Sequence, residues 1–144
     1  MSRTLIVAAA IVHFAAGPVL AADPAMELVA AATAGRVETV TDLLAQGADA
    51  NAKNGAGRPA LVAAAYNGNR RTAAALLVAG ADPNAADSAG NTALMGASAM
   101  GHVDTVRLLV AVGAKKDAKN AAGEDAVAMA QRAGHAAVEE MLSQ

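Results

Sequence analysis

The chain has no cysteine, no tryptophan and only one Phe and one Tyr among its 144 residues. The lack of cysteine excludes disulfides, thiolate zinc sites, a cysteine nucleophile and the lipid-bearing cysteine of a bacterial lipoprotein. Because aromatics are so scarce, the hydrophobic content of 55% comes mainly from Ala, Leu, Val and Met. Side chains this small favour a core in which helices approach closely, and the length favours one domain.

The chain also lacks a large excess of charge of either sign. The chain has 11 basic and 13 acidic residues, which gives a net charge of -2. These charges are scattered along the sequence, whereas binding to nucleic acid by counterion release requires a basic stripe or patch. We therefore expect no nucleic-acid partner.

Residues 1–21 have the three-part pattern of a cleavable export signal. Arg3 precedes an apolar run over residues 5–16, and a Gly-Pro pair that cannot continue a helix follows. Val19 and Ala21 then place small side chains at the two positions that the signal peptidase reads. The pattern predicts cleavage after Ala21.

A membrane anchor is the alternative interpretation of this segment. A membrane span needs roughly 20 apolar residues, and this run is shorter and contains His13. We expect a mature chain of residues 22–144, without a membrane span and located in the periplasm. The short, alanine-rich signal favours a Gram-negative bacterial source.

The same residue types recur every 33 positions, and such a period is typical of a repeat protein. Three columns are invariant over four units, namely Gly35, Gly68, Gly101 and Gly134; Ala31, Ala64, Ala97 and Ala130; and Leu43, Leu76, Leu109 and Leu142. A fourth column, Leu28, Leu61, Leu94 and Val127, has one conservative change. We expect four units, at about residues 23–49, 50–82, 83–115 and 116–144.

Each unit has the pattern of two short antiparallel helices. In the third unit, Thr92 can cap a helix over residues 92–100, and Gly101 can end it with a positive φ. Apolar residues at helical spacing predict a second helix over residues 103–112, ended by Gly113. The alanine columns allow neighbouring units to approach closely, while the leucine column fills the space between layers.

Segments rich in turn-forming residues connect the units. They run from Gly47 to Gly57 and from Gly80 to Gly90, and both suit an exposed, hairpin-like loop. We call these loops fingers. The predicted fold is an all-α solenoid of helix-turn-helix units with short finger loops.

The third unit closely resembles the consensus of the ankyrin-repeat family. It has Gly-Asn-Thr-Ala-Leu at 90–94, Gly-His-Val-Asp at 101–104, Leu-Leu at 108–109 and Gly-Ala at 113–114. The resemblance covers residues 23–144. The His of the family's Thr-Pro-Leu-His element is absent, since its position holds Val62, Met95 and Ala128. The hydrogen bonds that this His makes between units must be made by other residues or be absent.

Both ends of the repeat array have the pattern of a cap. The first unit begins with Asp23 as N-cap, followed by proline at the first helical position. In the last unit, Glu139 stands in the column that holds Val40, Ala73 and Val106. A polar outer face of this kind is what a repeat stack needs at its ends.

Residues that could carry chemistry are few, and each has a structural interpretation. His102 and His135 follow turn glycines one unit apart, where they can hydrogen-bond neighbouring loops but cannot share a metal directly. Ser98 lies four residues before His102, but no orienting carboxylate completes a triad. Asp49 and Asp82 fit turn-forming residues at the finger bases. We predict no enzyme activity, no metal site and no cofactor.

The resemblance implies that fingers and first helices form a concave face that holds a protein partner. Carried over position by position, this face comprises Lys53, Arg58, Tyr66, Asn67, Ser88, Asn91, Met100, Lys119, Glu124 and Arg132. Tyr66, the one tyrosine, suits a binding hot spot or a ring that covers the second unit, and the sequence leaves both open.

We predict a monomeric envelope module that holds one protein partner. Alternatives are an immunity or stress-protection factor that binds a toxin or an envelope enzyme, and a small-ligand carrier. The carrier requires a convergent polar pocket, which the sequence does not supply.

Overall fold

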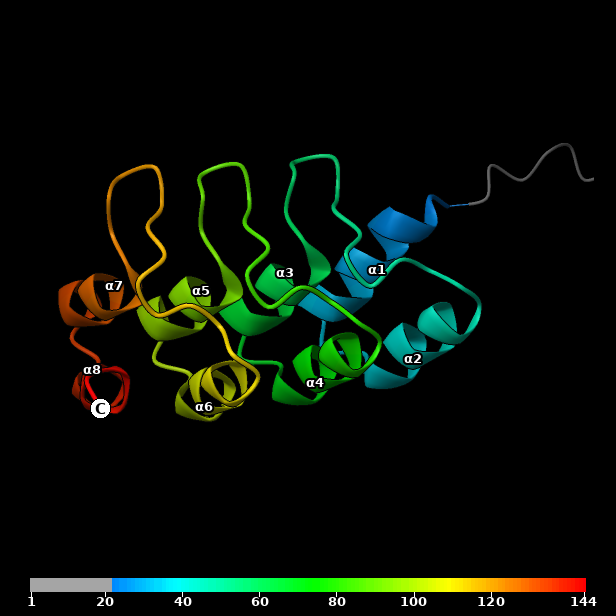
Figure 1. Cartoon of the computed structure of the whole chain (residues 1–144). Coiled ribbons are helices and arrows are strands. Elements are labelled where there is room, and N and C mark those ends of the chain that lie inside the picture. Colours follow the sequence, from blue (N-terminus) through cyan, green and yellow to red (C-terminus); the bar gives the residue numbers. More distant parts are fainter. Residues whose placement is uncertain (1–21) are drawn as a thin grey trace, which may run out of the picture.

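The computed structural model describes residues 22–144, so the predicted export signal lies outside the described residues. The described part forms eight short helices and no strand (Figure 1). They are α1 Pro24–Thr33, α2 Val37–Ala45, α3 Ala60–Tyr66, α4 Arg70–Val78, α5 Ala93–Ala99, α6 Val103–Ala111, α7 Ala126–Ala133 and α8 Ala136–Leu142. Each of the four expected units contains one helix pair, and the predicted all-α solenoid is confirmed.

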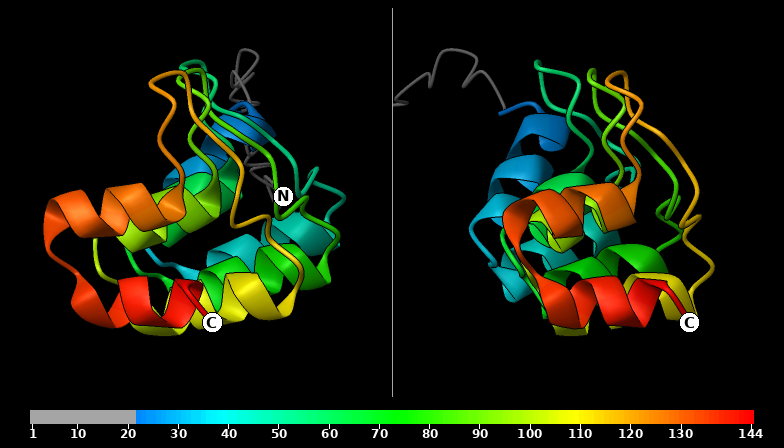
Figure 2. Two further views of the ribbon diagram at one scale, coloured as in Figure 1. Left: turned by 60° about the vertical axis from the view of Figure 1, so that its left-hand side comes forward. Right: turned by 90° about the vertical axis from the view of Figure 1, so that its left-hand side faces the viewer.

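The helices lie in two rows with the fingers on one side (Figures 1 and 2). Helices α1, α3, α5 and α7 form the inner row, and α2, α4, α6 and α8 form the outer row. Three fingers rise from the inner row, namely the two predicted ones and a third between α6 and α7. Isolated antiparallel bridges join Lys53 to Pro59 and Ala86 to Thr92 across the first two. The fingers and the inner row therefore enclose a concave face.

Side-chain caps set the starts of three inner helices. The carboxylate of Asp23 accepts a hydrogen bond from the N–H of Ala25 at 3.0 Å, and Asp125 accepts one from Ala128 at 2.9 Å. The hydroxyl of Thr92 accepts one from the N–H of Met95 at 3.4 Å. These bonds satisfy amides at the helix N-terminus that have no intrahelical partner. The helix predicted over 92–100 is α5, with Thr92 and residue 100 as its caps.

The turns inside the helix pairs require glycine for two reasons. Gly68 has a φ of +70°, in the left-handed region that favours glycine. A Cβ added there would also lie 2.6 Å from Nδ1 of His102, so the ring of the next unit covers this turn. Gly101 relates to His135 in the same way, with a Cβ at 2.5 Å from Nδ1. The histidines thus pack on the turn of the preceding unit.

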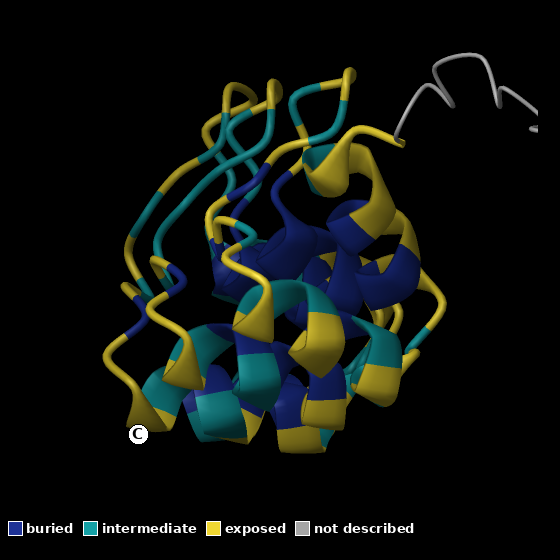
Figure 3. Cartoon of the chain, turned by 90° about the vertical axis from the view of Figure 1, so that its right-hand side faces the viewer, coloured by how far each residue is buried: buried dark blue, intermediate teal, exposed yellow. Residues whose placement is uncertain are grey.

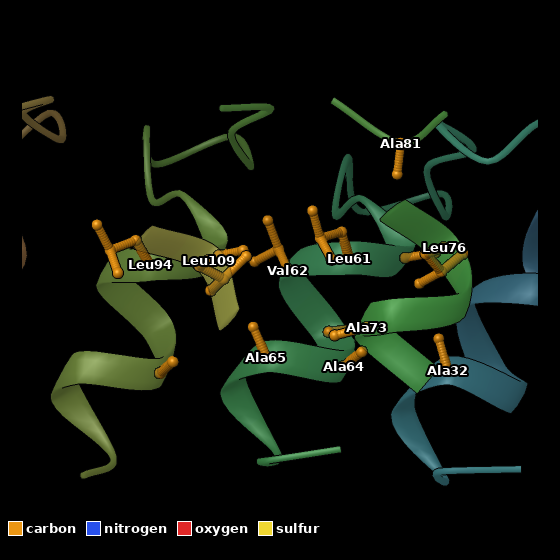
Figure 4. Close-up of a cluster of buried hydrophobic side chains, with 14 of the residues drawn as sticks. Ala32, Leu61, Val62, Ala64, Ala65, Ala73, Leu76, Ala81, Leu94 and Leu109 are labelled. Carbon is orange, nitrogen blue, oxygen red and sulfur yellow. The ribbon is translucent and has the colours of Figure 1, made fainter. Parts of the chain in front are cut away.

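The core lies between the two rows of helices, where buried residues concentrate (Figure 3). Figure 4 shows leucines of the second and third units in one cluster with alanines of the first and second units. Leu76 and Leu109 are fully buried, as predicted for the leucine column, and Leu142 is nearly so. Leu43, in the same column, is half-buried, because no layer precedes the first unit in the described structure.

Asparagines form hydrogen bonds between neighbouring units. Asn51 accepts a hydrogen bond from the N–H of Asp82 at 2.7 Å, and Asn84 accepts one from Lys115 at 2.8 Å. At the finger tips, the Asn120 amide donates to Oδ1 of Asn91 at 2.9 Å. The hydrogen bonds between units are therefore made by other residues.

The predicted turn-forming role of the finger-base carboxylates is confirmed. Oδ1 of Asp49 accepts a hydrogen bond from the N–H of Asn51, and Oδ1 of Asp82 accepts one from Asn84, each at 2.9 Å. Each carboxylate thus closes a local turn two residues long.

The fourth unit ends the described stack with polar side chains. Nε2 of Gln131 donates to Oε1 of Glu139 at 2.8 Å across α7 and α8. In the preceding unit the corresponding positions hold Ser98 and Val106, and both are fully buried. The two polar side chains satisfy each other on the face where a further unit would stack, as expected for a cap.

Candidate binding site on the concave face

A small pocket lies on the concave face where the second, third and fourth units meet. Its helical lining consists of Val62, Tyr66, Gly96, Ala99 and Met129, from α3, α5 and α7. Its finger lining consists of Arg58, Asp87 and Asn91. The cavity measures about 80 Å³. The pocket thus has an apolar floor and walls with polar groups at the fingers.

Tyr66 forms one wall of the pocket. Its side chain is 45% exposed, although the ring is the largest apolar group of the described inner row. A Cβ built on Gly96 would lie 3.5 Å from Cβ and 3.6 Å from Cδ2 of Tyr66, so the ring lies beside the bare backbone of α5. Tyr66 therefore contacts the third unit and still presents surface to solvent, which is compatible with both of its predicted roles.

Arg58 brings a cation to the finger side of the pocket without a carboxylate bonded to it. Within residues 22–144, two ion pairs form, and Arg58 belongs to neither. Two units further along, the equivalent positions hold Glu124 and Arg132, which form an ion pair at 3.0 Å. In the second unit the same two columns hold Arg58 and Tyr66. The Arg58 guanidinium therefore has no carboxylate at the position that pairs with it in the fourth unit.

Asp87 also lines the pocket, but its carboxylate already supports the second finger. Its Oδ1 accepts hydrogen bonds from the N–H groups of Ala89 and Asn91, each at 2.9 Å. Asn54 and Asn120 make the same pair of bonds in the other two fingers. The Asp87 carboxylate therefore stabilises its own turn. Arg58 is the charged group of the pocket that is available to a partner.

Of the ten residues predicted for the concave face, the pocket brings together three: Arg58, Tyr66 and Asn91. Glu124 and Arg132 lie in the fourth unit, outside the pocket lining, and form an ion pair with each other.

Three of the other predicted residues use their polar atoms within the chain. The Lys53 ammonium donates to the carbonyl of Ala86 at 3.4 Å, and Ser88 donates to the carbonyl of Ala56 at 2.9 Å, so both link the first two fingers. The Asn67 amide donates to a carbonyl within its own helix at 2.9 Å. Met100, which is 43% exposed, and Lys119 remain available at the surface.

Sequence reasoning missed five lining residues: Val62, Asp87, Gly96, Ala99 and Met129. Four of them are apolar or lack a side chain, and such residues in a helix read as core. A signal did exist in one column, which holds Ala30, Ala63, Gly96 and Met129 and so combines the smallest side chain with a long one. Within this column, Gly96 forms the floor of the pocket and Met129 forms the wall opposite Tyr66.

The residues weighed for catalysis are used in other ways. Nε2 of His102 lies 3.0 Å from the carbonyl oxygen of Tyr66, so the predicted hydrogen bond to the neighbouring unit forms, at the end of α3 and not in a loop. Ser98 is fully buried, and its Oγ has no hydrogen-bond partner. Among residues 22–144 no group of three or more His, Asp or Glu side chains is arranged to hold a metal ion. Nor does any helix there have the length and apolar character needed to cross a membrane.

Stacked antiparallel helix pairs with fingers on one side define a helical repeat protein. The family model for ankyrin repeats, in three copies, matches residues 28–120, which is more than half of the chain. The chain therefore belongs to the ankyrin-repeat family, whose repeats are generally protein-binding modules and typically non-catalytic. A comparison with curated proteins found no match.

Proposed function

We propose that this protein is an exported bacterial envelope module that binds one protein partner on its concave face. The observation that carries the proposal is the pocket between Tyr66 and Met129, where a half-exposed aromatic ring and an unpaired guanidinium meet on the surface that ankyrin repeats offer to partners. Tyr and Arg are among the residue types enriched in binding hot spots.

The size of the pocket favours a protein over a small molecule. Small-molecule sites usually measure roughly 300–1,000 Å³ and enclose most of their ligand. This pocket measures about 80 Å³ and opens onto the concave face. A side chain of a larger partner suits it better than a whole metabolite, so we place the carrier function second.

The predicted signal over residues 1–21 supports an envelope location. A small, monomeric binding module in the periplasm suits an immunity or stress-protection role, in which it masks a toxin or an envelope enzyme. These roles differ in the identity of the partner and share the same binding surface.

An affinity pull-down from the envelope fraction of the native cells tests this function. The baits are the mature wild-type chain, Tyr66→Ala and Arg58→Glu. Matched controls on the outer row are Val78→Ala, which trims a side chain that is 91% exposed, and Arg71→Glu, which reverses an exposed charge. We expect the wild type and both controls to retain the same partner, and the two concave-face variants to lose it. If both concave-face variants recover that partner at wild-type strength, the binding face is wrong.

A further inference from the structure

Gly96 occupies a position in α5 where the fold does not require glycine. It lies in the interior of the helix, where glycine is less favourable than alanine, and it is not among the glycines with positive φ. A Cβ added there would meet Tyr66 at 3.5–3.6 Å, which is ordinary van der Waals contact. The equivalent residues Ala30, Ala63 and Met129 all carry a Cβ. Neither backbone conformation nor lack of space therefore explains this glycine.

The missing methyl group opens the floor of the pocket. Gly96 lies between Tyr66 and Met129, so a side chain at 96 would occupy space between the two walls. The cavity of about 80 Å³ is well below the roughly 300–1,000 Å³ of small-molecule sites. One aliphatic side chain therefore suits it better than a whole ligand. With apolar walls, its occupant is an aliphatic group.

The positive charge beside the pocket indicates which kind of residue lies next to that aliphatic group in the partner. Arg58 has no ion pair and no side-chain hydrogen bond within the described residues, and it is exposed. Lys53 adds a second cation to the same finger, while the Asp87 carboxylate is occupied by the N–H groups of its own turn. A carboxylate on the partner complements this arrangement.

We propose that the pocket anchors one aliphatic side chain of a partner segment whose adjacent acidic residue pairs with Arg58. The inference rests on the proposed function and specifies the partner's chemistry at that same face. The glycine then reflects binding rather than folding, since it leaves room for the anchor and weakens α5.

The protein offers a single-site optical probe of this pocket. Tyr66 is the one tyrosine of the chain, and tryptophan is absent, so the tyrosine emission of the protein reports on one pocket wall. Peptides without Tyr and Trp can therefore be titrated without interference. The first probe is a displayed library of random 12-residue peptides that lack Tyr and Trp, selected on the wild-type protein. Synthetic copies of the enriched peptides then serve for fluorescence titration.

We expect the enriched peptides to share Leu, Ile, Val or Met next to Asp or Glu, and to change the Tyr66 emission on binding. Gly96→Ala should bind them roughly 10- to 100-fold more weakly, because the buried aliphatic group loses its place. The same variant should melt at a higher temperature than the wild type, since alanine favours the helix. Weaker binding by a more stable protein cannot result from unfolding.

Two further variants isolate the two parts of the proposal. Gly55→Ala adds a methyl group in open space on the first finger, where no positive φ demands glycine, and should leave affinity unchanged. Arg58→Glu should select peptides with Lys or Arg beside the same aliphatic residue.

Several outcomes would overturn the proposal. These are no enrichment, enriched peptides without the acidic and aliphatic pair, equal binding by Gly96→Ala, or an unchanged acidic preference on Arg58→Glu. Such results would leave the pull-down intact, because a folded partner can bind the concave face elsewhere. Failure of the pull-down together with failure of the selection would remove the proposed function as well.

Discussion

Nε2 of His102 lies 3.0 Å from the carbonyl oxygen of Tyr66, so the turn of the third unit holds the end of the helix that carries the pocket ring. The imidazole also packs on Gly68, which immediately follows the C-cap of that helix. One unit earlier, Asn69 has the same relation to Gly35 and donates to the carbonyls of Ala32 and Thr33, each at 3.0 Å. The column thus links each unit to the preceding one.

This link predicts a defined loss on substitution. His102→Ala should lower the free energy of unfolding by about 1 kcal/mol, because one hydrogen bond and the ring contact with Gly68 disappear. Urea denaturation measures the change. His102→Asn is the matched control, since Asn69 makes comparable bonds in the second unit, and it should restore most of the stability. Equal losses in both variants would contradict a role for the hydrogen bond.

The leucine column predicts a loss that depends on burial. Leu109→Ala should lower stability by about 2 to 5 kcal/mol, because it leaves a cavity at a fully buried position. Leu43→Ala removes the same atoms from a half-buried position and should be less destabilising. Val112→Ala, at an exposed site, should change stability by less than about 0.5 kcal/mol. A melting temperature unchanged by Leu109→Ala would rule out its place in the core.

Two buried hydroxyl groups predict variants that gain stability. The Oγ of Ser98 and the Oγ1 of Thr72 are buried without a hydrogen-bond partner. Ser98→Ala should raise the free energy of unfolding by about 1 kcal/mol, because an unsatisfied buried polar group is removed. The equivalent position in the second unit is Ala65, which is fully buried. Thr72→Val preserves shape and should act in the same direction. A lower melting temperature for both would show that the hydroxyls make favourable contacts.

The signal at residues 1–21 predicts a processed protein. Expression of the whole chain in a Gram-negative host should yield a periplasmic product that begins at Ala22, as measured by intact mass. Ala21→Phe places a large side chain at the position before the cut and should leave an uncleaved precursor. A wild-type product that keeps Met1 and stays in the cytoplasm would exclude export.

The polar cap of the fourth unit predicts an effect on assembly. Gln131→Ala with Glu139→Val would replace the hydrogen-bonded pair by residue types that the interior units use at these positions. An apolar end should then associate with other copies, and sedimentation should show a mass that rises with concentration. Glu140→Val, on the exposed face of α8, is the control and should sediment like the wild type. A double variant that stays monomeric would show that the pair does not limit association.

Most of the fold follows from the 33-residue columns. A residue type that recurs at one place in every unit must suit the same environment each time, so Leu76 and Leu109 are recognisable as core and Gly101 as a turn. Local rules then set the helix ends, as at Thr92 and Asp23. These inferences succeed because each depends on contacts within one unit or between identical neighbours.

The pocket was only partly predictable, for the opposite reason. Tyr66, Gly96 and Met129 come from three different units and from two different columns. Their meeting depends on how successive layers are offset, which the period alone does not specify. The exposed residues Arg58 and Tyr66 were found because the resemblance to ankyrin repeats places their positions on the concave face. Gly96 was not predicted, because a glycine in a helix has no side chain that would suggest a binding role.

Because three successive units form the pocket, the distance between its walls depends on the curvature of the stack. Tyr66 and Met129 stand two repeats apart, so any change in the rotation between layers moves one wall relative to the other. An occupant that bridges the two walls would fasten the second unit to the fourth. The second and fourth units should then move less relative to each other in the bound protein than in the free protein.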